Sequence, residues 1–295
     1  MTDDPVTDHP VADGLRRHAR SFGSVAEQYD RGRPGYPAPA VRWLVGREAA
    51  TVLELGAGTG KLTAELLAQG HDVHATEPDP AMLAILRRHL PDVPTSESGA
   101  EEIPLPDRSV DVVVVGQAFH WFDHDVALPE IARVLRPGGA LALTWNQRNE
   151  RIPWVRKLWA LLGDQPRLRQ GTDDATDALV QSKLFGFVDR QSFPSWQDIN
   201  RDSIQDLVAS RSYVATLGED ARAAKLAEVL AFYDDYGRGM DGMQLSYQCE
   251  CYRAIVVDRS DPEPPGGQTP EGDAATPATG PSDGTDTDLL LIDFR

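Results

Sequence analysis

A run of closely spaced glycines is the strongest candidate for a ligand site in this sequence. The segment 56–60 reads Gly-Ala-Gly-Thr-Gly, directly after the segment 52–55 (Val-Leu-Glu-Leu) and directly before an amphipathic stretch that begins at Lys61. Glycines at this spacing let the backbone turn tightly and leave room for a ligand against the main chain. The pattern predicts a strand, a ligand-binding loop and a helix, in that order.

A nucleotide cofactor is the ligand class that this loop favours. A dinucleotide site needs G-x-G-x-x-G, with the helix N-terminus directed at a pyrophosphate. Here Gly60 comes one residue early and Lys61 takes the place of the last glycine, which favours S-adenosylmethionine over a dinucleotide. Glu77 lies 17 residues beyond Gly60, where a carboxylate can accept both hydroxyl groups of a ribose. The alternative for Glu77 is a surface carboxylate that caps the turn before Pro78.

Short apolar runs then alternate with amphipathic stretches, which is typical of βαβ units in a parallel sheet. We expect strands at 52–55, 72–76, 93–96, 110–115, 140–145, 187–193 and 244–257, with a turn at 137–139. We expect helices at 38–47, 61–69, 80–90, 126–135, 152–163, 203–217 and 220–236, after a short helix within 22–36. The predicted fold is α/β, a Rossmann-like and mostly parallel sheet of seven strands with the last one antiparallel, helices on both faces and a helical lid region.

The composition predicts one folded domain with a tail at each end. Residues 1–20 and the acidic, Pro- and Gly-rich residues 258–295 have almost nothing to bury and are predicted to be disordered. The domain is predicted to span 21–257. Within it, 147–245 departs from the regular alternation and is expected to form the acceptor pocket, the lid and the final strands. The end of the second tail, Leu-Leu-Leu-Ile-Asp-Phe at 289–294, is either without function or a docking peptide.

Charge and cysteine content limit the partners. The net charge is −17, which disfavours binding to nucleic acid and to anionic lipid. The two cysteines, Cys249 and Cys251, would lie on one face of a strand and are too close in sequence for an unstrained disulfide. We interpret them as strand thiols rather than metal ligands. With no apolar run long enough to span a membrane, the expectation is a cytoplasmic protein without a membrane partner.

The glycine loop and Glu77, together with the segments 100–107 (Ala-Glu-Glu-Ile-Pro-Leu-Pro-Asp) and 111–115 (Asp-Val-Val-Val-Val), carry a family resemblance. The sequence resembles the class I S-adenosylmethionine-dependent methyltransferases, and within them the methyltransferase type 11 group. The segments 22–37 and 116–122 look like those of trans-aconitate methyltransferase-like proteins. The resemblance covers roughly 22–145, with a weaker match at 252–256.

The resemblance implies a cofactor site for S-adenosylmethionine. Its residues would be Glu54, Gly56, Ala57, Gly58, Gly60, Glu77, Pro78, Met82, Ala100, Glu101, Gln117, Tyr29 and Arg33. Glu77 would hold the ribose, and Ala100 with Glu101 would border the adenine. Many relatives have Asp just before the Ala-Glu pair, and this sequence has Gly99, so adenine contact would depend on backbone groups or on Glu101. Arg33 is equally well explained as a surface charge.

Methyl transfer is an in-line displacement, so alignment and exclusion of water matter most. His120, just past the central strand, is the candidate general base; its alternative role is to form a wall of the pocket together with Trp121. Tyr36, Trp121, Trp145 and Asn146 are the candidate acceptor-pocket residues, although Trp145 could also belong to the core. No metal is required.

The predicted function is methyl transfer to a small-molecule acceptor, a carboxylic acid or a secondary metabolite. Two alternatives remain open: a nicotinamide-dependent oxidoreductase, and a non-catalytic S-adenosylmethionine-binding interaction protein.

Overall fold

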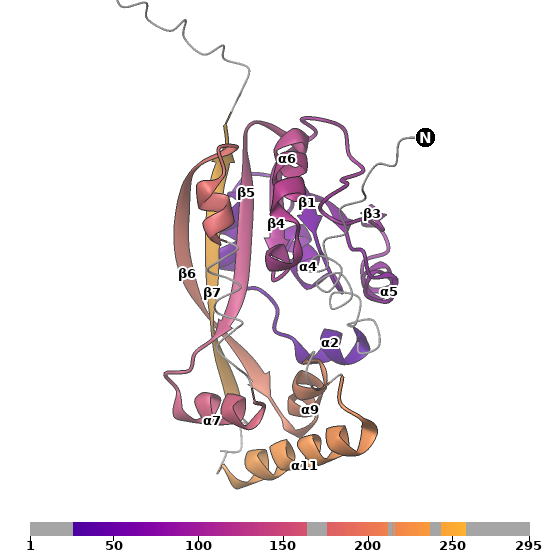
Figure 1. The fold of residues 1–295 in the computed structure, drawn as a ribbon, viewed down its shortest axis with the longest axis vertical. Coiled ribbons are helices and arrows are strands. Elements are labelled where there is room, and N and C mark those ends of the chain that lie inside the picture. The colour runs from indigo at the N-terminus through magenta and orange to yellow at the C-terminus, as the bar shows by residue number, and fades with distance from the viewer. Residues whose placement is uncertain (1–25, 164–175, 212–213, 215, 237–242, 258–295) are drawn as a thin grey trace, which may run out of the picture. The chain divides into compact units, whose positions relative to one another are not determined.

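The structure is a computed structural model that describes residues 26–163, 176–211, 214, 216–236 and 243–257. All of these residues belong to one compact unit, Met1–Asp258. Both predicted tails lie outside the described residues. Figure 1 shows the central sheet, whose seven strands have the order β3-β2-β1-β4-β5-β7-β6.

The sheet confirms the predicted topology. Its strands are β1 (Thr51–Leu55), β2 (Asp72–Thr76), β3 (Thr95–Ser96), β4 (Val110–Gly116), β5 (Leu135–Arg148), β6 (Phe185–Ile199) and β7 (Met243–Val256). The pairs from β3 to β5 are parallel, whereas β7 is antiparallel to both β5 and β6. The carboxyl ends of β1, β2 and β4 therefore meet at one edge, where ligands of open α/β sheets bind.

Helices cover both faces of the sheet. They are α2 (Ala26–Gly32), α3 (Ala38–Val45), α4 (Lys61–Ala68), α5 (Pro80–His89), α6 (His124–Val134), α7 (Pro153–Leu161), α9 (Arg201–Ala209) and α11 (Glu219–Asp235). Along β4, Val113 and Val115 pack in a cluster with residues of α6, whereas Val112 and Val114 pack in a cluster with residues of α3 and α4. Burial on both faces explains why residues 112–115 of the central strand are four consecutive valines.

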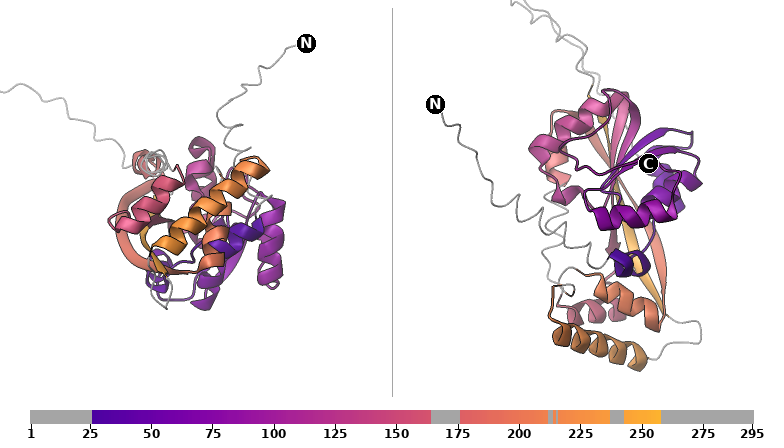
Figure 2. Two further views of the ribbon diagram at one scale, coloured as in Figure 1. Left: turned by 90° about the horizontal axis from the view of Figure 1, so that it is seen from below. Right: turned by 90° about the vertical axis from the view of Figure 1, so that its right-hand side faces the viewer.

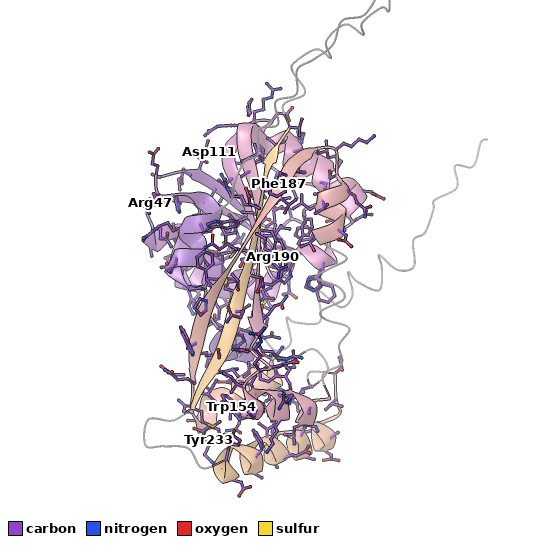
Figure 3. The ribbon with its side chains drawn as sticks, turned by 90° about the vertical axis from the view of Figure 1, so that its left-hand side faces the viewer. Arg47, Asp111, Trp154, Phe187, Arg190 and Tyr233 are labelled. Carbon is purple, nitrogen blue, oxygen red and sulfur yellow. The ribbon has the colours of Figure 1, made fainter. Side chains whose placement is uncertain are left out.

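A second hydrophobic core lies where β6 and β7 extend beyond the parallel strands. The ends of these strands pack with α7, α9 and α11, and Trp154 and Tyr233 belong to this core (Figures 2 and 3). Figure 3 shows both side chains at the end of the sheet opposite Arg47 and Asp111. We call this second core, with its three helices, the lid core.

Several predicted boundaries were wrong. The helix predicted at 203–217 is α9, which begins at Arg201 and ends at Ala209. Asn200 caps its start, and at its end the hydroxyl of Ser210 donates to the carbonyl oxygen of Leu207 at 2.7 Å, a side-chain bond that competes with helix continuation. Strand β6, predicted at 187–193, extends to Ile199 because its end also packs in the lid core, whereas β7 lies within one residue of the predicted 244–257.

The predicted turn at 137–139 lies inside β5. Gly138 there has φ +78°, and the pairing of β4 with β5 changes register between Val110 and Val112. A left-handed glycine allows such an irregularity without ending the strand.

Helix α2 packs against α9 with almost no space between their backbones. A Cβ atom on Gly32 would lie 2.4 Å from the carbonyl carbon of Asp206. Two polar contacts reinforce this approach: Arg31 donates to both carboxylate oxygens of Asp206 at 2.8 and 2.9 Å, and Gln197 Nε2 donates to the carbonyl oxygen of Gly32 at 2.9 Å. Only glycine fits at this contact.

We predict that Gly32→Ala lowers the free energy of unfolding by about 2 kcal/mol, because the new methyl group meets backbone atoms that cannot move independently. Gly35→Ala is the matched control, since a Cβ there has no heavy atom within 4 Å. Urea denaturation of both variants measures the difference. Equal stability of the two variants would contradict the packing described.

Candidate active site

The glycine loop leaves open space at its centre. Gly56, Gly58 and Gly60 all have left-handed backbone angles, with φ of +67°, +59° and +89°. A Cβ on Gly56 would lie 2.6 Å from the Cβ of Ala118, so the loop packs closely against the segment after β4. A Cβ on Gly58 would meet no heavy atom within 4 Å. The loop therefore offers exposed main chain to a ligand at Gly58.

Glu77 lies beside that open position. Its Oε2 accepts a hydrogen bond from the backbone N–H of Gly58 at 2.8 Å, and its Oε1 accepts from the N–H of Asp79 at 2.9 Å. Burial raises the pKa of the Glu77 carboxyl to about 7, although these two N–H donors act to lower it. The carboxyl group is thus placed at the loop and titrates near neutral pH.

Glu54 lies deeper, on β1 itself. Its side chain is 1% exposed and accepts a hydrogen bond from the Thr63 hydroxyl at 2.6 Å. Burial raises the pKa of Glu54 to about 8, and the negative charge of Glu77 adds to the rise. Glu54 therefore joins β1 to α4 beneath the loop.

A third group of residues connects the ends of β4 and β5. Gln117, directly after β4, has φ +63°, which is uncommon for a residue other than glycine, and its N–H donates to the carbonyl oxygen of Thr144. A Cβ on Gly116 would lie 2.6 Å from the Tyr36 hydroxyl oxygen. Asn146 Nδ2 donates to the carbonyl oxygen of Gly35 at 3.0 Å. These contacts bring the predicted pocket residues Tyr36 and Asn146 to the strand edge.

Helix α2 brings Tyr29 to the same edge. Its ring packs with Met82 of α5, which is 4% exposed. The guanidinium carbon of Arg33 lies 5.0 Å from the Tyr29 ring centroid, and its nitrogens donate to the hydroxyl and the carbonyl oxygen of Ser210, both at 3.1 Å. Arg33 therefore reaches towards α9, and its predicted cofactor role stays a prediction.

The segment after β3 has a partly structural role. Ala100 is buried in the core, and Glu101 accepts a hydrogen bond from the N–H of Asp123 at 3.0 Å, at the start of α6. A Cβ on Gly99 would lie 2.7 Å from Glu101 Oε2, so glycine leaves room for this carboxylate.

His120 lies in a short 3-10 turn, Phe119–Trp121, just past β4. Its ring centroid is 4.5 Å from that of Trp121. Burial, together with a smaller effect of the neighbouring His124, lowers the pKa of His120 to about 4. The imidazole is therefore neutral at pH 7. Trp145, by contrast, is 3% exposed and packs edge-on against Tyr252, which favours the core alternative.

Four buried polar atoms at this edge have no hydrogen-bond partner among the described residues: Thr59 Oγ1, Ser98 Oγ, His120 Nδ1 and Asn146 Oδ1. Buried polar groups are rarely left unpaired, so a polar ligand fits this edge. The donors, acceptors and open main chain suit a nucleoside that carries an amino acid. Sequence reasoning missed both residues: Thr59 lies inside the glycine loop, and Ser98 lies between the predicted strand 93–96 and the segment 100–107.

Two surface hollows lie among the described residues, and neither is lined by all four of the residues that carry these unpaired atoms. One, of about 210 Å³, lies on the helix side of the loop beside Thr59, Lys61 and Asp30. The other, of about 360 Å³, lies near Arg42 and Gln69 and includes none of the predicted site residues.

Among the described residues there is no cluster of three or more His, Cys, Asp or Glu side chains suited to a metal ion. The same part of the chain has no helix that is long and apolar enough to cross a membrane.

Comparison with known proteins identifies the family to which the chain belongs. The methyltransferase domain family matches residues 53–143. An uncharacterized methyltransferase of Mycobacterium tuberculosis is 45% identical over 240 residues, covering 80% of this chain and 96% of the relative. The chain is a class I S-adenosylmethionine-dependent methyltransferase.

Two further similar proteins are also named as methyltransferases. An uncharacterized methyltransferase-like protein of Schizosaccharomyces pombe is 32% identical over 255 residues, covering 83% of this chain and 96% of the relative. A solved structure, titled a putative type II methyltransferase from Anaeromyxobacter dehalogenans, superposes with a TM-score of 0.56 at 25% identity, covering 76% of this chain and 97% of the other. The family implies S-adenosylmethionine as the methyl donor. The resemblance to trans-aconitate methyltransferase-like proteins stays a prediction.

We predict that S-adenosylhomocysteine, the product form of the cofactor, binds more tightly as pH rises from about 5.5 to 7.5. Ribose hydroxyl groups donate best to an ionised carboxylate, and burial raises the pKa of Glu77 to about 7. The protonated form dominates below that value, so affinity should fall by up to about tenfold for each pH unit below 7. Isothermal titration calorimetry at several pH values measures this.

Glu77→Gln is the matched variant for this measurement, because the amide keeps the size of the carboxyl but does not titrate. It should bind weakly at every pH. Glu48→Gln, an exposed carboxylate in the loop between α3 and β1, should behave as the wild type. A pH profile that is the same in Glu77→Gln and the wild type would exclude Glu77 as the ribose ligand.

Proposed function

We propose that this methyltransferase transfers the methyl group to a carboxylate oxygen of a small-molecule acceptor. The observation that carries the proposal is the neutral state of His120, whose pKa is lowered to about 4 by burial. An imidazole with so low a pKa is a weak base at pH 7, because proton abstraction is most effective when the pKa of the base is close to the working pH. The site therefore suits an acceptor that is already ionised.

The cofactor supplies an activated methyl group on a sulfonium, so the protein has to hold and orient the reactants. In this proposal Gly58 and Glu77 hold the nucleoside, and the side chains of Tyr29 and Met82, which pack together, contact it from one side. Tyr36 lies against Gly116 at the end of β4, and Asn146 is held at the end of β5 by its hydrogen bond to Gly35; these two residues position the acceptor. His120 is a neutral wall of the pocket that presents Nδ1 to the acceptor and keeps water out.

The acceptor pocket in this proposal extends under 147–245, which includes the lid core. The position of α9 supports this, since its C-terminal end receives Arg33 from the segment that borders the cofactor edge. A relative supports the acceptor class. A malonyl-[acyl-carrier protein] O-methyltransferase of Halorhodospira halophila is 32% identical over 243 residues, covering 76% of this chain and 81% of the relative. Its name describes methyl transfer to oxygen of a group that carries a carboxylate.

The test is incubation of the full chain with S-adenosylmethionine labelled in the methyl group and a panel of short carboxylic acids. We predict a labelled product that releases volatile methanol in mild alkali, because methyl esters hydrolyse there and methyl ethers and N-methyl groups do not. Matched primary amides of the same acids should give no product. Label that is incorporated from a cell extract but is stable in alkali would contradict the carboxylate acceptor. Cofactor binding without transfer to any acceptor would favour a non-catalytic binding protein.

A second prediction concerns His120. We expect His120→Asn to keep kcat within about tenfold of the wild type, with an unchanged pH profile, because no proton has to be removed from a carboxylate. Removal of a true general base would instead cost about 10²- to 10⁴-fold in rate. Initial rates between pH 6 and 9 distinguish these outcomes, and His74→Asn, a histidine on β2 bonded to the Ser96 hydroxyl, is the control.

A further inference from the structure

The smaller of the two surface hollows, of about 210 Å³, lies where the start of α4 meets the end of α5 and helix α2. Its lining includes Thr59 and Lys61 at the start of α4, Asp30 of α2 and His89 of α5. Neither Gly58 nor Glu77, the residues proposed to hold the nucleoside, belongs to this lining. The hollow is therefore separate from the proposed nucleoside site, although both lie at the same loop.

Thr59 brings an unused hydroxyl group to this hollow. The residue is 3% exposed, and its Oγ1 is buried without a hydrogen-bond partner among the described residues. The other unpaired polar atoms of the active site belong to Ser98, His120 and Asn146, which do not line the hollow. Because buried hydroxyl groups are rarely left unpaired, the hollow is where a polar partner for Thr59 fits.

Helix α4 begins at this hollow with its positive end uncapped. Gly60, the residue before the helix, has the left-handed φ of +89°, no side chain caps the first turn, and that turn contains no acidic residue. The N–H groups of a first turn have no partner within the helix, and with the helix dipole they attract anions. Gly60 and Lys61 both line the hollow, so this end of α4 is directed at its occupant.

Lys61 adds a half-buried cation. Burial lowers the pKa of its ammonium group, and the negative charge of Asp30 opposes that effect. Within the part of the chain that the structure describes, the ammonium group forms no hydrogen bond and no ion pair, since Asp30 acts on it only from a longer distance. A cation that has lost water without gaining a close anion favours an oxyanion in the hollow.

Asp30 is a charge in the lining that opposes an anion. Its side chain is 17% exposed, and its Oδ2 lies 3.8 Å from Nδ1 of His89. A like charge at this place weakens the binding of an anion, so the site is expected to be weak. It also gives the experiment a variant in which binding should become tighter.

We propose that Thr59, Lys61 and the first turn of α4 bind a phosphate group in this hollow. A tetrahedral oxyanion can accept hydrogen bonds from a hydroxyl group, an ammonium group and helix N–H groups at the same time. The phosphate group is that of free inorganic phosphate or that of a phosphorylated metabolite, which share this chemistry. The site goes beyond the proposed function, because neither the cofactor nor the methyl acceptor occupies it.

The test is calorimetric titration of the full chain with inorganic phosphate and, separately, with glycerol 3-phosphate, at an ionic strength kept constant with chloride. We expect at least one of them to bind in the millimolar range. Tighter binding of inorganic phosphate identifies free phosphate as the ligand, and tighter binding of glycerol 3-phosphate identifies a phosphorylated metabolite. Equal affinities mean that the site recognises the phosphate group alone.

Matched variants assign the binding to this hollow. Lys61→Met should weaken phosphate binding by about tenfold, because it removes a charge-assisted donor. Thr59→Val should also weaken it, and Thr59→Ser, which keeps the hydroxyl group, should not. Asp30→Asn should strengthen binding by about threefold, since it removes a negative charge and no donor. Lys157→Met, at an exposed lysine of α7, should bind as the wild type does.

The gain expected for Asp30→Asn cannot arise from a loss of folding, so it complements the losses expected for Lys61→Met and Thr59→Val. If neither ligand binds, the hollow is not a phosphate site. The proposal is equally wrong if Lys61→Met and Thr59→Val bind phosphate as tightly as the wild type, or if Asp30→Asn binds it more weakly. None of these results depends on methyl transfer, so they leave the proposed function to its own test.

Discussion

The hydrogen bond from the Gly58 N–H to the Glu77 carboxylate joins the two segments that form the predicted cofactor site, the glycine loop and the residues after β2. It connects the loop after β1 with the end of β2 at 2.8 Å, and the second oxygen of Glu77 accepts from Asp79, whose own side chain caps α5. The bond also keeps a buried carboxyl close to open main chain. Burial raises the pKa of this carboxyl to about 7, so we propose that Glu77 determines both the recognition of the ribose and its dependence on pH.

A second line of contacts connects that edge to the lid core. It runs from Asn146 at the end of β5 to the carbonyl oxygen of Gly35, and then through Arg33 to Ser210 at the end of α9. Close packing of Gly32 against α9 stiffens the same connection. The segment 33–35 is therefore held to the end of β5 and to the end of α9 by direct contacts. We therefore expect a substitution in one of these parts to alter the position of the others.

Much of the fold could be predicted because local patterns determine it. The apolar run of β4, the glycine loop and the carboxylate after β2 are all short-range signals, and each predicted element from 38 to 135 was confirmed with small shifts at its ends. The end of α9 could not be predicted, since it depends on Ser210 and on Arg33, 177 residues away. Likewise, no local signal predicts that the guanidinium carbons of Arg148 and Arg211 lie 5.1 and 4.9 Å from the ring centroid of Trp159. Those contacts depend on tertiary packing of the long strands.

A crystal structure with bound S-adenosylhomocysteine tests the central claim most directly. The account predicts that the Glu77 carboxylate accepts hydrogen bonds from both ribose hydroxyl groups, that the ligand lies against the main chain of Gly58, and that Thr59 or Ser98 gains a polar partner. A ligand whose ribose lies away from Glu77, with the bond between Glu77 and the Gly58 N–H unchanged, would contradict it.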